Sequence, residues 1–209
     1  MLLALALTFG LNAQTPAPAV RSISSGVGST NSMVALGGII TISGTNLAPS
    51  SMNLGAFMGQ TLPMTLGGVQ VSIGGRMAPI FMVSPTMIVA QVPFEVDLGP
   101  RPVQVTNGTL TGAPFTVNVD ATAPALFSDG SGGIVVKAAD YSLVGAANPA
   151  LPGEELLLYA TGLGQTSPGL NTGMIAASSQ ANTGTVTAQF DGQPAEVRYS
   201  VAAPGFVGL

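Results

Sequence analysis

Cysteine, histidine and tryptophan are all absent from the 209 residues of this chain. Without thiolate or imidazole ligands, the usual zinc and iron–sulfur sites cannot form. No thiol nucleophile is available, and every catalytic triad that depends on histidine is excluded. The missing residue types therefore remove several large classes of metalloprotein and hydrolase.

Charged side chains are scarce as well. They make up 7% of the residues, whereas soluble domains average about 25%. The net charge is −4, and the few cations are scattered along the chain. Binding to nucleic acid or to an anionic membrane needs clustered Lys and Arg, so the sequence predicts no nucleic-acid partner and no membrane insertion of the mature chain. The five cations are Arg21, Arg76, Arg101, Lys137 and Arg198.

Glycine (28), proline (16) and short β-branched runs are plentiful, and 46% of the residues are hydrophobic. Apolar and polar side chains alternate with a period of two in residues 69–73, 115–119, 186–190 and 197–201, as expected for strands with one buried face. Turn dipeptides that supply positive φ separate such runs. Together these patterns predict an all-β fold. The turn dipeptides are Gly74-Gly75, Asn107-Gly108 and Asp191-Gly192.

An internal repeat runs through the chain at a nearly constant offset of 117 to 119 residues. Its matches include a strand end, a hairpin turn and a proline turn, and its length is that of a complete β-sandwich of roughly 100 residues. We therefore predict two tandem sandwiches. The matched pairs are Gly44 with Gly162, Gly75 with Gly192, Ala78 with Ala195, Ile80 with Val197, and Pro85 with Pro204.

The repeat also predicts the domain boundaries. The first sandwich is expected at residues 20–120 and the second at residues 121–209. The second has no counterpart of residues 86–96, "TMIVAQVPFEV", or of the last hairpin of the first. We expect it to be truncated at the C-terminus, with an unpaired sheet edge.

The N-terminus has an apolar stretch from Leu2 to Leu11. It is too short to cross a bilayer, because a spanning helix needs about 20 apolar residues. It is typical of the core of a signal peptide, with cleavage near Ala13. The alternative is a buried strand or helix. Residues 1–19 are thus expected to be a signal peptide and short linker, and the protein to be exported to the periplasm, the cell surface or the medium.

Four segments carry a resemblance to a known family: "GGIITISGTNLAP", "LPMTLGGVQVSIGGRMAPIFMVSPTMIVAQVPFEV", "PGEELLLYATGLGQTSPG" and "FDGQPAEVRYSVAAPGFVGL". In this order they resemble a repeat at the C-terminal ends of exported acidobacterial proteins, which is similar to immunoglobulin-like IPT/TIG domains. The first copy departs by having Leu36-Gly37 where Pro-Gly is usual. The resemblance implies an immunoglobulin-like fold and export, and it brings no catalytic residues.

The sequence predicts no catalytic, cofactor-binding or metal-binding residues. A glycosidase needs two carboxylates about 5–9.5 Å apart across a cleft, and the nine carboxylates are widely scattered. The loop "SDGSGG", residues 128–133, offers only Asp129 as an acidic ligand, too few for calcium. The carboxylates are Glu95, Asp97, Asp120, Asp129, Asp140, Glu154, Glu155, Asp191 and Glu196.

The long connection at residues 48–68 is a candidate contact loop, because flexible apolar side chains gather in it. The alternative is that these side chains fold back and cap the open end of the sandwich, as long loops usually do. The residues concerned are Met52, Leu54, Phe57 and Met58.

These observations predict a non-enzymatic exported module that spaces, presents or adheres at the cell envelope or outside the cell, and that needs no cofactor. Its polar, weakly charged surface suits neutral partners, so we expect polysaccharide or another envelope protein to bind. Sugar-binding surfaces usually stack the sugar rings on Trp or Tyr. Because aromatics are only 5% of the residues, the case for polysaccharide as the partner is the weaker one. The alternative is an accessory or targeting pair of domains in a larger extracellular enzyme.

Overall fold

A computed structural model describes residues 16–27, 32–54, 61–128 and 132–208. Every regular element in those ranges is a β-strand, so the predicted all-β class is confirmed. In the same ranges there is no helix with the length and apolar character needed to cross a bilayer. The predicted signal-peptide core, within residues 1–15, lies outside the described residues.

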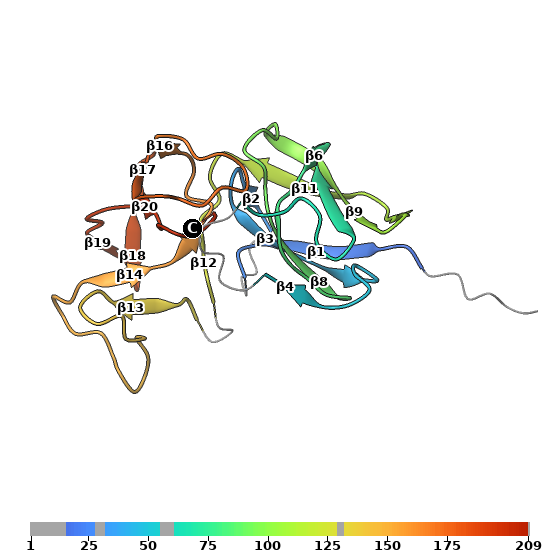
Figure 1. Ribbon diagram of the computed structural model, residues 1–209. Helices are drawn as coiled ribbons and strands as arrows, with labels where there is room; N and C mark the ends of the chain where they lie inside the picture. Colours follow the sequence, from blue (N-terminus) through green and yellow to red (C-terminus); the bar gives the residue numbers. More distant parts are fainter. Residues whose placement is uncertain (1–15, 28–31, 55–60, 129–131, 209) are drawn as a thin grey trace, which may run out of the picture.

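The first half of the chain forms an immunoglobulin-like sandwich of two sheets (Figure 1). One sheet has five antiparallel strands with β8 between β3 and β7. Its order is β1 (Ala19–Ser25), β3 (Ile39–Thr45), β8 (Met87–Gln91), β7 (Ile80–Val83) and β4 (Met52–Asn53).

The other sheet of the sandwich has six strands, with β9 at its centre. Strand β2 pairs with β11 in parallel, and the other neighbours pair antiparallel. The order is β2 (Val34–Ala35), β11 (Phe115–Asp120), β9 (Gly99–Asn107), β5 (Val69–Ile73) and β6 (Arg76–Met77), and β10 (Leu110–Thr111) also pairs with β9.

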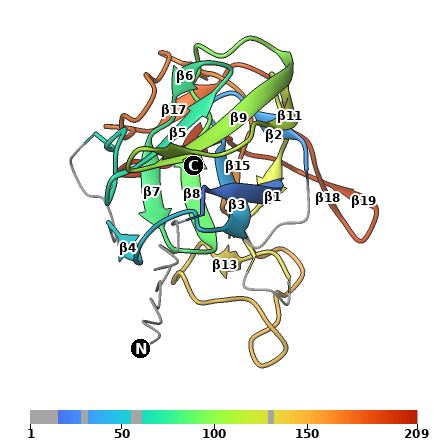
Figure 2. The same ribbon diagram turned by 90° about the vertical axis from the view of Figure 1, so that its right-hand side faces the viewer.

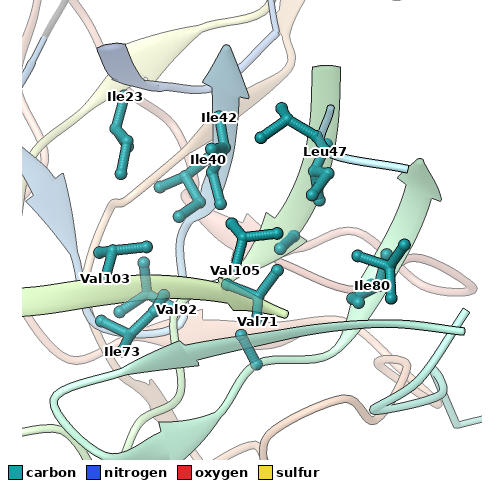
Figure 3. Packing of buried hydrophobic residues seen from close by; sticks show 14 of the residues in the cluster. Ile23, Ile40, Ile42, Leu47, Val71, Ile73, Ile80, Val92, Val103 and Val105 are labelled. Atoms are coloured by element: carbon teal, nitrogen blue, oxygen red, sulfur yellow. The ribbon is translucent and has the colours of Figure 1, made fainter. Parts of the chain in front are cut away.

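The hydrophobic core lies between these two sheets. Strand β5 alternates as predicted: Val69, Val71 and Ile73 are fully buried, and Gln70 between them is exposed. Ile40 and Ile42 of β3 meet them from the opposite sheet (Figure 3). Each such side chain contributes about 1.5–3 kcal/mol by burial, so the first half has a complete core of its own.

The second half consists of short strands in separate small sheets (Figures 1 and 2). Among the described residues it holds no cluster of large buried side chains like that of the first half. The sheets are β12 (Ala125–Leu126) with β15 (Ala160–Thr161), β13 (Val135–Lys137) with β14 (Leu156–Leu158), β16 (Thr166–Ser167) with β17 (Gln180–Asn182) and β20 (Val201–Ala202), and β18 (Ala188–Phe190) with β19 (Gln193–Ala195). That this half is a second sandwich stays a prediction.

Two strand predictions in the second half are wrong in extent. Residues 186–190 form a strand only over Ala188–Phe190, and residues 197–201 join one only at Val201. Phe190, expected to face a core, is 73% exposed. The alternating pattern is present, but a strand needs neighbours to pair with and a second layer to cover it. Among the described residues, β18 pairs with β19 alone and β20 pairs with β17 alone.

The predicted turns hold at two places and shift at a third. Gly74 and Gly75 both have positive φ, and so do Asp191 and Gly192, as a two-residue hairpin of this type requires. Between β9 and β10, however, Asn107 pairs with Leu110. The turn there is Gly108–Thr109, one residue later than predicted, with glycine at its positive-φ position.

Candidate functional site

The candidate contact loop is only partly described. Met52 lies in β4, pairs with Val83 and is 43% exposed, whereas Leu54 is half-buried and packs against the core of the first half. Phe57 and Met58 lie outside the described residues. The proposed role of this loop in contacts therefore remains a prediction.

Several of the described carboxylates have a basic partner. Asp97 lies 3.6 Å from Arg101, Glu154 lies 3.1 Å from Lys137, and Glu155 lies 3.3 Å from Arg198. Within the described ranges, no three of the acidic residues come together as a metal site. Asp129, the acidic residue of the glycine-rich loop, lies outside those ranges.

The densest group of charges surrounds a shallow hollow of ≈ 280 Å³ lined by Lys137, Ala138, Ala139, Glu154 and Glu155. The Leu151 backbone N–H, which donates to Glu154, and then Lys137 hold the pKa of Glu154 below its usual value. Hydrogen bonds from Ser142 lower the pKa of nearby Asp140. Both carboxyls are thus ionised at neutral pH, whereas a glycosidase needs one acid with a raised pKa.

Acid should weaken this group of contacts. A carboxyl with a depressed folded-state pKa adds stability above its unfolded pKa of about 4, and that stability is lost as the pH falls through the folded value. Replacing Glu154 by Gln should therefore lower the thermal midpoint at pH 7 and make the midpoint less sensitive to pH between about 3 and 5. Thermal melts followed by circular dichroism measure this.

The control is Glu196→Gln, because Glu196 is exposed in the same half and belongs to none of the ion pairs of the described residues. If the thermal midpoint of the Glu154→Gln protein depended on pH as strongly as that of the unchanged chain, Glu154 would not be the source of the acid sensitivity.

The junction between the halves is where buried polar groups from distant parts of the chain meet. We call it the joint, and define it by Gly37, Gln91, Thr161, Thr172 and Gly173. Gln91, at the end of β8, is 1% exposed. Its Nε2 donates to Gly37 O at 3.0 Å, and its Oε1 accepts from Gly173 N–H at 2.7 Å. One amide therefore links a turn of the first half to a loop of the second.

The same loop of the second half makes three further hydrogen bonds to the first half. Thr172 Oγ1 accepts from Phe94 N–H at 2.9 Å and donates to Glu95 Oε2 at 2.7 Å. The carbonyl of Gly173 accepts from Leu62 N–H at 2.9 Å. Gly173 has φ +78, and an added Cβ would lie 3.2 Å from Pro79. Glycine thus allows the backbone to sit directly on the first half.

A second set of contacts lies beside the start of β3. Thr161 Oγ1 accepts from Ile39 N–H at 2.8 Å and donates to Gly208 O at 2.6 Å. An added Cβ on Gly38 would lie 3.4 Å from Gly162 Cα, so the two backbones are in direct contact. Because Thr161 is 1% exposed, water does not compete for these bonds.

A cavity of ≈ 40 Å³ adjoins the joint and is lined in part by Gly37, Phe94, Thr161 and Val201. Such a volume has room for only a few water molecules, whereas pockets for small organic ligands measure about 300–1,000 Å³. The joint is therefore built to hold two parts of the chain together, and it has no room for a substrate or cofactor.

The joint was not predicted from the sequence. Its signal is a lone polar residue at the end of an apolar run: Gln91 in "MIVAQV" and Thr161 in "LLLYATG". Such residues must find hydrogen-bond partners when buried, but the sequence does not say where the partners lie. Those partners are backbone groups from distant parts of the chain, whose composition is unremarkable.

Comparison with known proteins agrees with the sandwich. The model of the IPT/TIG domain family matches residues 18–122, which covers half of the chain and all the strands of the first sandwich. No curated protein matches the chain. IPT/TIG domains are non-catalytic immunoglobulin-like domains with structural or interaction roles. The match, the sheet order and the buried core together place the chain in the IPT/TIG domain family.

Proposed function

We propose that the chain is a non-enzymatic, exported structural module, which holds its two halves in one orientation and so acts as a stiff arm at the cell envelope or outside the cell. The observation that carries this proposal is the joint. Three of its hydrogen bonds, made by Gln91 and Thr161, are buried, and the one from Phe94 to Thr172 is partly buried. A flexible tether between the halves would need none of them.

The energetics support stiffness. A net contribution of about 0.5–1.5 kcal/mol is typical of one intramolecular hydrogen bond, and a buried group left without a partner costs about 1–3 kcal/mol. Turning one half against the other would break the bonds of Gln91, Thr161 and Thr172 together. The sum is several times the thermal energy, so one relative orientation should dominate.

The surface supports a presenting or adhesive role toward neutral partners. Charged side chains make up only 7% of the chain, and three ion pairs of the described residues bring some of them together. Polysaccharide or another envelope protein is the partner class that such a surface fits, because hydrogen bonding rather than charge would provide the contact. Binding to a panel of immobilised polysaccharides separates adhesion from plain spacing.

A distance measurement tests the stiff arm. The chain contains no cysteine, so spin labels can be placed at Thr116→Cys in β11 and Ala181→Cys in β17 without side reactions. Both positions are exposed, one in each half. We expect one narrow distribution of label-to-label distances by pulsed electron resonance. A broad distribution, spanning many orientations of the halves, would contradict the proposal.

Export is tested separately. Residues 1–30 fused to a reporter enzyme that is active only outside the cytoplasm should give reporter activity in a bacterial host. Deleting residues 2–11, the apolar stretch, should abolish that activity. Reporter protein that remains in the cytoplasm with the intact leader would contradict the proposed localisation.

A further inference from the structure

A tight turn at residues 171–174 brings the second half to the joint. The backbone N–H of Met174 donates to Asn171 O at 3.1 Å and closes the turn. Its two central residues, Thr172 and Gly173, are the ones that bond to the first half. Its two end residues, Asn171 and Met174, are exposed. The shape of this turn therefore determines whether the joint can form.

The end residues of the turn also hold each other through their side chains. Asn171 Nδ2 donates to Met174 Sδ at 3.5 Å. A thioether sulfur is a weak acceptor, and the same sulfur is the atom that an oxidant attacks. Because Met174 is 45% exposed, a small oxidant can reach its side chain from solvent. The contact that closes the turn is thus chemically reactive.

The chain is fixed again just beyond the turn. Ala176 is 1% exposed, its N–H donates to Phe206 O at 3.0 Å, and its C=O accepts from Gly205 N–H at 2.8 Å. The turn therefore lies between two anchored points, with the joint before Met174 and Ala176 after it. A change in the shape of the turn must be taken up by one of these anchors.

Methionine is the side chain through which oxidation can act on this chain, since cysteine, histidine and tryptophan are absent. Met174 is the single methionine of residues 121–209. The other exposed methionines of the described ranges lie in the first half, which has a complete core. They are Met33, Met52, Met64 and Met77. An oxidant that acts on the second half through its own residues must therefore act at Met174.

We propose that Met174 is an oxidation site that loosens the joint. Hydrogen peroxide transfers one oxygen atom to Sδ, using an electron pair of the sulfur; the thioether becomes a sulfoxide and the peroxide is reduced to water. The added oxygen makes the side chain larger, polar and chiral beside Asn171 Nδ2, so the turn has to change shape. This inference rests on the proposed stiff arm, and it adds a chemical signal that controls the stiffness.

The joint has little room for such a change. Thr172 and Gly173 bond to the first half at 2.7–2.9 Å, and Gly173 lies directly on Pro79. Hydrogen bonds weaken steeply when their geometry is distorted. A turn that shifts by a fraction of an ångström therefore weakens several of these bonds together, and the second half loses its main attachment.

Hydrogen peroxide is the probe, and mass spectrometry of the peptide that contains Met174 gives the fraction converted to sulfoxide. In the oxidised chain, hydrogen exchange in residues 156–202 should be at least about three-fold faster, whereas strands β3, β5 and β9 should keep their rates. The label-to-label distances between positions 116 and 181 should spread. Reduction by methionine sulfoxide reductases that act on both epimers should restore the slow exchange.

Three variants locate the effect. Met174→Leu keeps a side chain of similar size that peroxide does not oxidise, so its exchange should not respond to peroxide. Met77→Leu is the matched control, because Met77 is 38% exposed in β6 of the first half, and it should respond as the unchanged chain does. Asn171→Ala keeps the sulfur and removes the neighbour that the new oxygen meets, so its response should be at least about two-fold smaller.

Several results would overturn the proposal. They are complete conversion of Met174 to sulfoxide with unchanged or slower exchange in residues 156–202, an equal response to peroxide in Met174→Leu, and resistance of Met174 to peroxide that oxidises Met77. A failure of the stiff arm itself looks different, because the label-to-label distances are then broadly distributed before any peroxide is added.

Discussion

Replacing Ile40 by Ala should destabilise the protein by about 2–5 kcal/mol, whereas replacing Leu158 by Ala should cost less than about 1 kcal/mol. The two residues are equivalent in the internal repeat, at an offset of 118. Ile40 is fully buried between the sheets of the first sandwich, and Leu158 is 49% exposed at the end of β14. Removing buried methyl groups leaves a cavity, and removing exposed ones does not.

Urea unfolding followed by circular dichroism measures both free energies. Ile40→Val serves as the milder step at the same site and should cost about 0.5–1.5 kcal/mol. Similar costs for Ile40→Ala and Leu158→Ala would mean that the side chain of Leu158 is enclosed to the same degree. In that case the second half would have a core that its described residues do not form.

This contrast explains how far the sequence predicts the fold. In the first half the alternation of Val69, Val71 and Ile73 predicts a half-buried strand, and the strand is present with that face inward. In the second half Val186, Ala188 and Phe190 show the same alternation, yet only three residues form a strand. Periodicity predicts which face is apolar, but neighbouring strands and a covering layer decide whether the strand forms.

The sequence predicts turns about equally well in the two halves, unlike strands, because a turn depends mainly on its own residues. Asp191-Gly192 adopts the expected positive φ angles even where the flanking strands are short. The shift of the β9–β10 turn to Gly108–Thr109 shows the limit: Asn107 stays in the ladder because β5 pairs with it on the other side. Tertiary pairing thus overrides the local preference by one residue.

The candidate site was the least predictable feature. The sequence indicates Met52 and Leu54 as contact residues, because flexible apolar side chains gather in their loop. The buried contacts between the halves instead involve Gln91 and Thr161. Each makes its bonds to backbone atoms far along the chain. A buried amide can be suspected from its apolar neighbours, but its partners depend on how the two halves dock, which neither half encodes alone.

The joint should also determine whether the second half stays ordered. Strands β12 to β20 are two or three residues long. Most of the large apolar side chains in the described part of the second half are partly or fully exposed. Such short pieces are marginal by themselves. Docking onto the complete core of the first half supplies the missing stability, so loosening the joint should release the second half first.

Gln91→Leu is the sharpest test, since it removes both bonds of the amide while nearly conserving volume. It leaves Gly37 C=O and Gly173 N–H buried without their partner, which should cost about 2–4 kcal/mol. Hydrogen exchange read by mass spectrometry should speed up in residues 156–202. Strands β3, β5 and β9, supported by the sandwich core, should keep their protection.

Two further variants separate the joint from the core of the first half. Thr172→Val removes the contacts with Phe94 and Glu95 from the side of the second half, and it should release the same residues without touching β8. Gln70→Leu is the matched control, because Gln70 is exposed and its side chain donates to Thr65 within the first half. Suppose instead that Gln91→Leu speeds up hydrogen exchange equally in both halves, or in neither. The joint would then not be what keeps the second half ordered on the first. The stiff arm would then have to be held by something other than these buried hydrogen bonds.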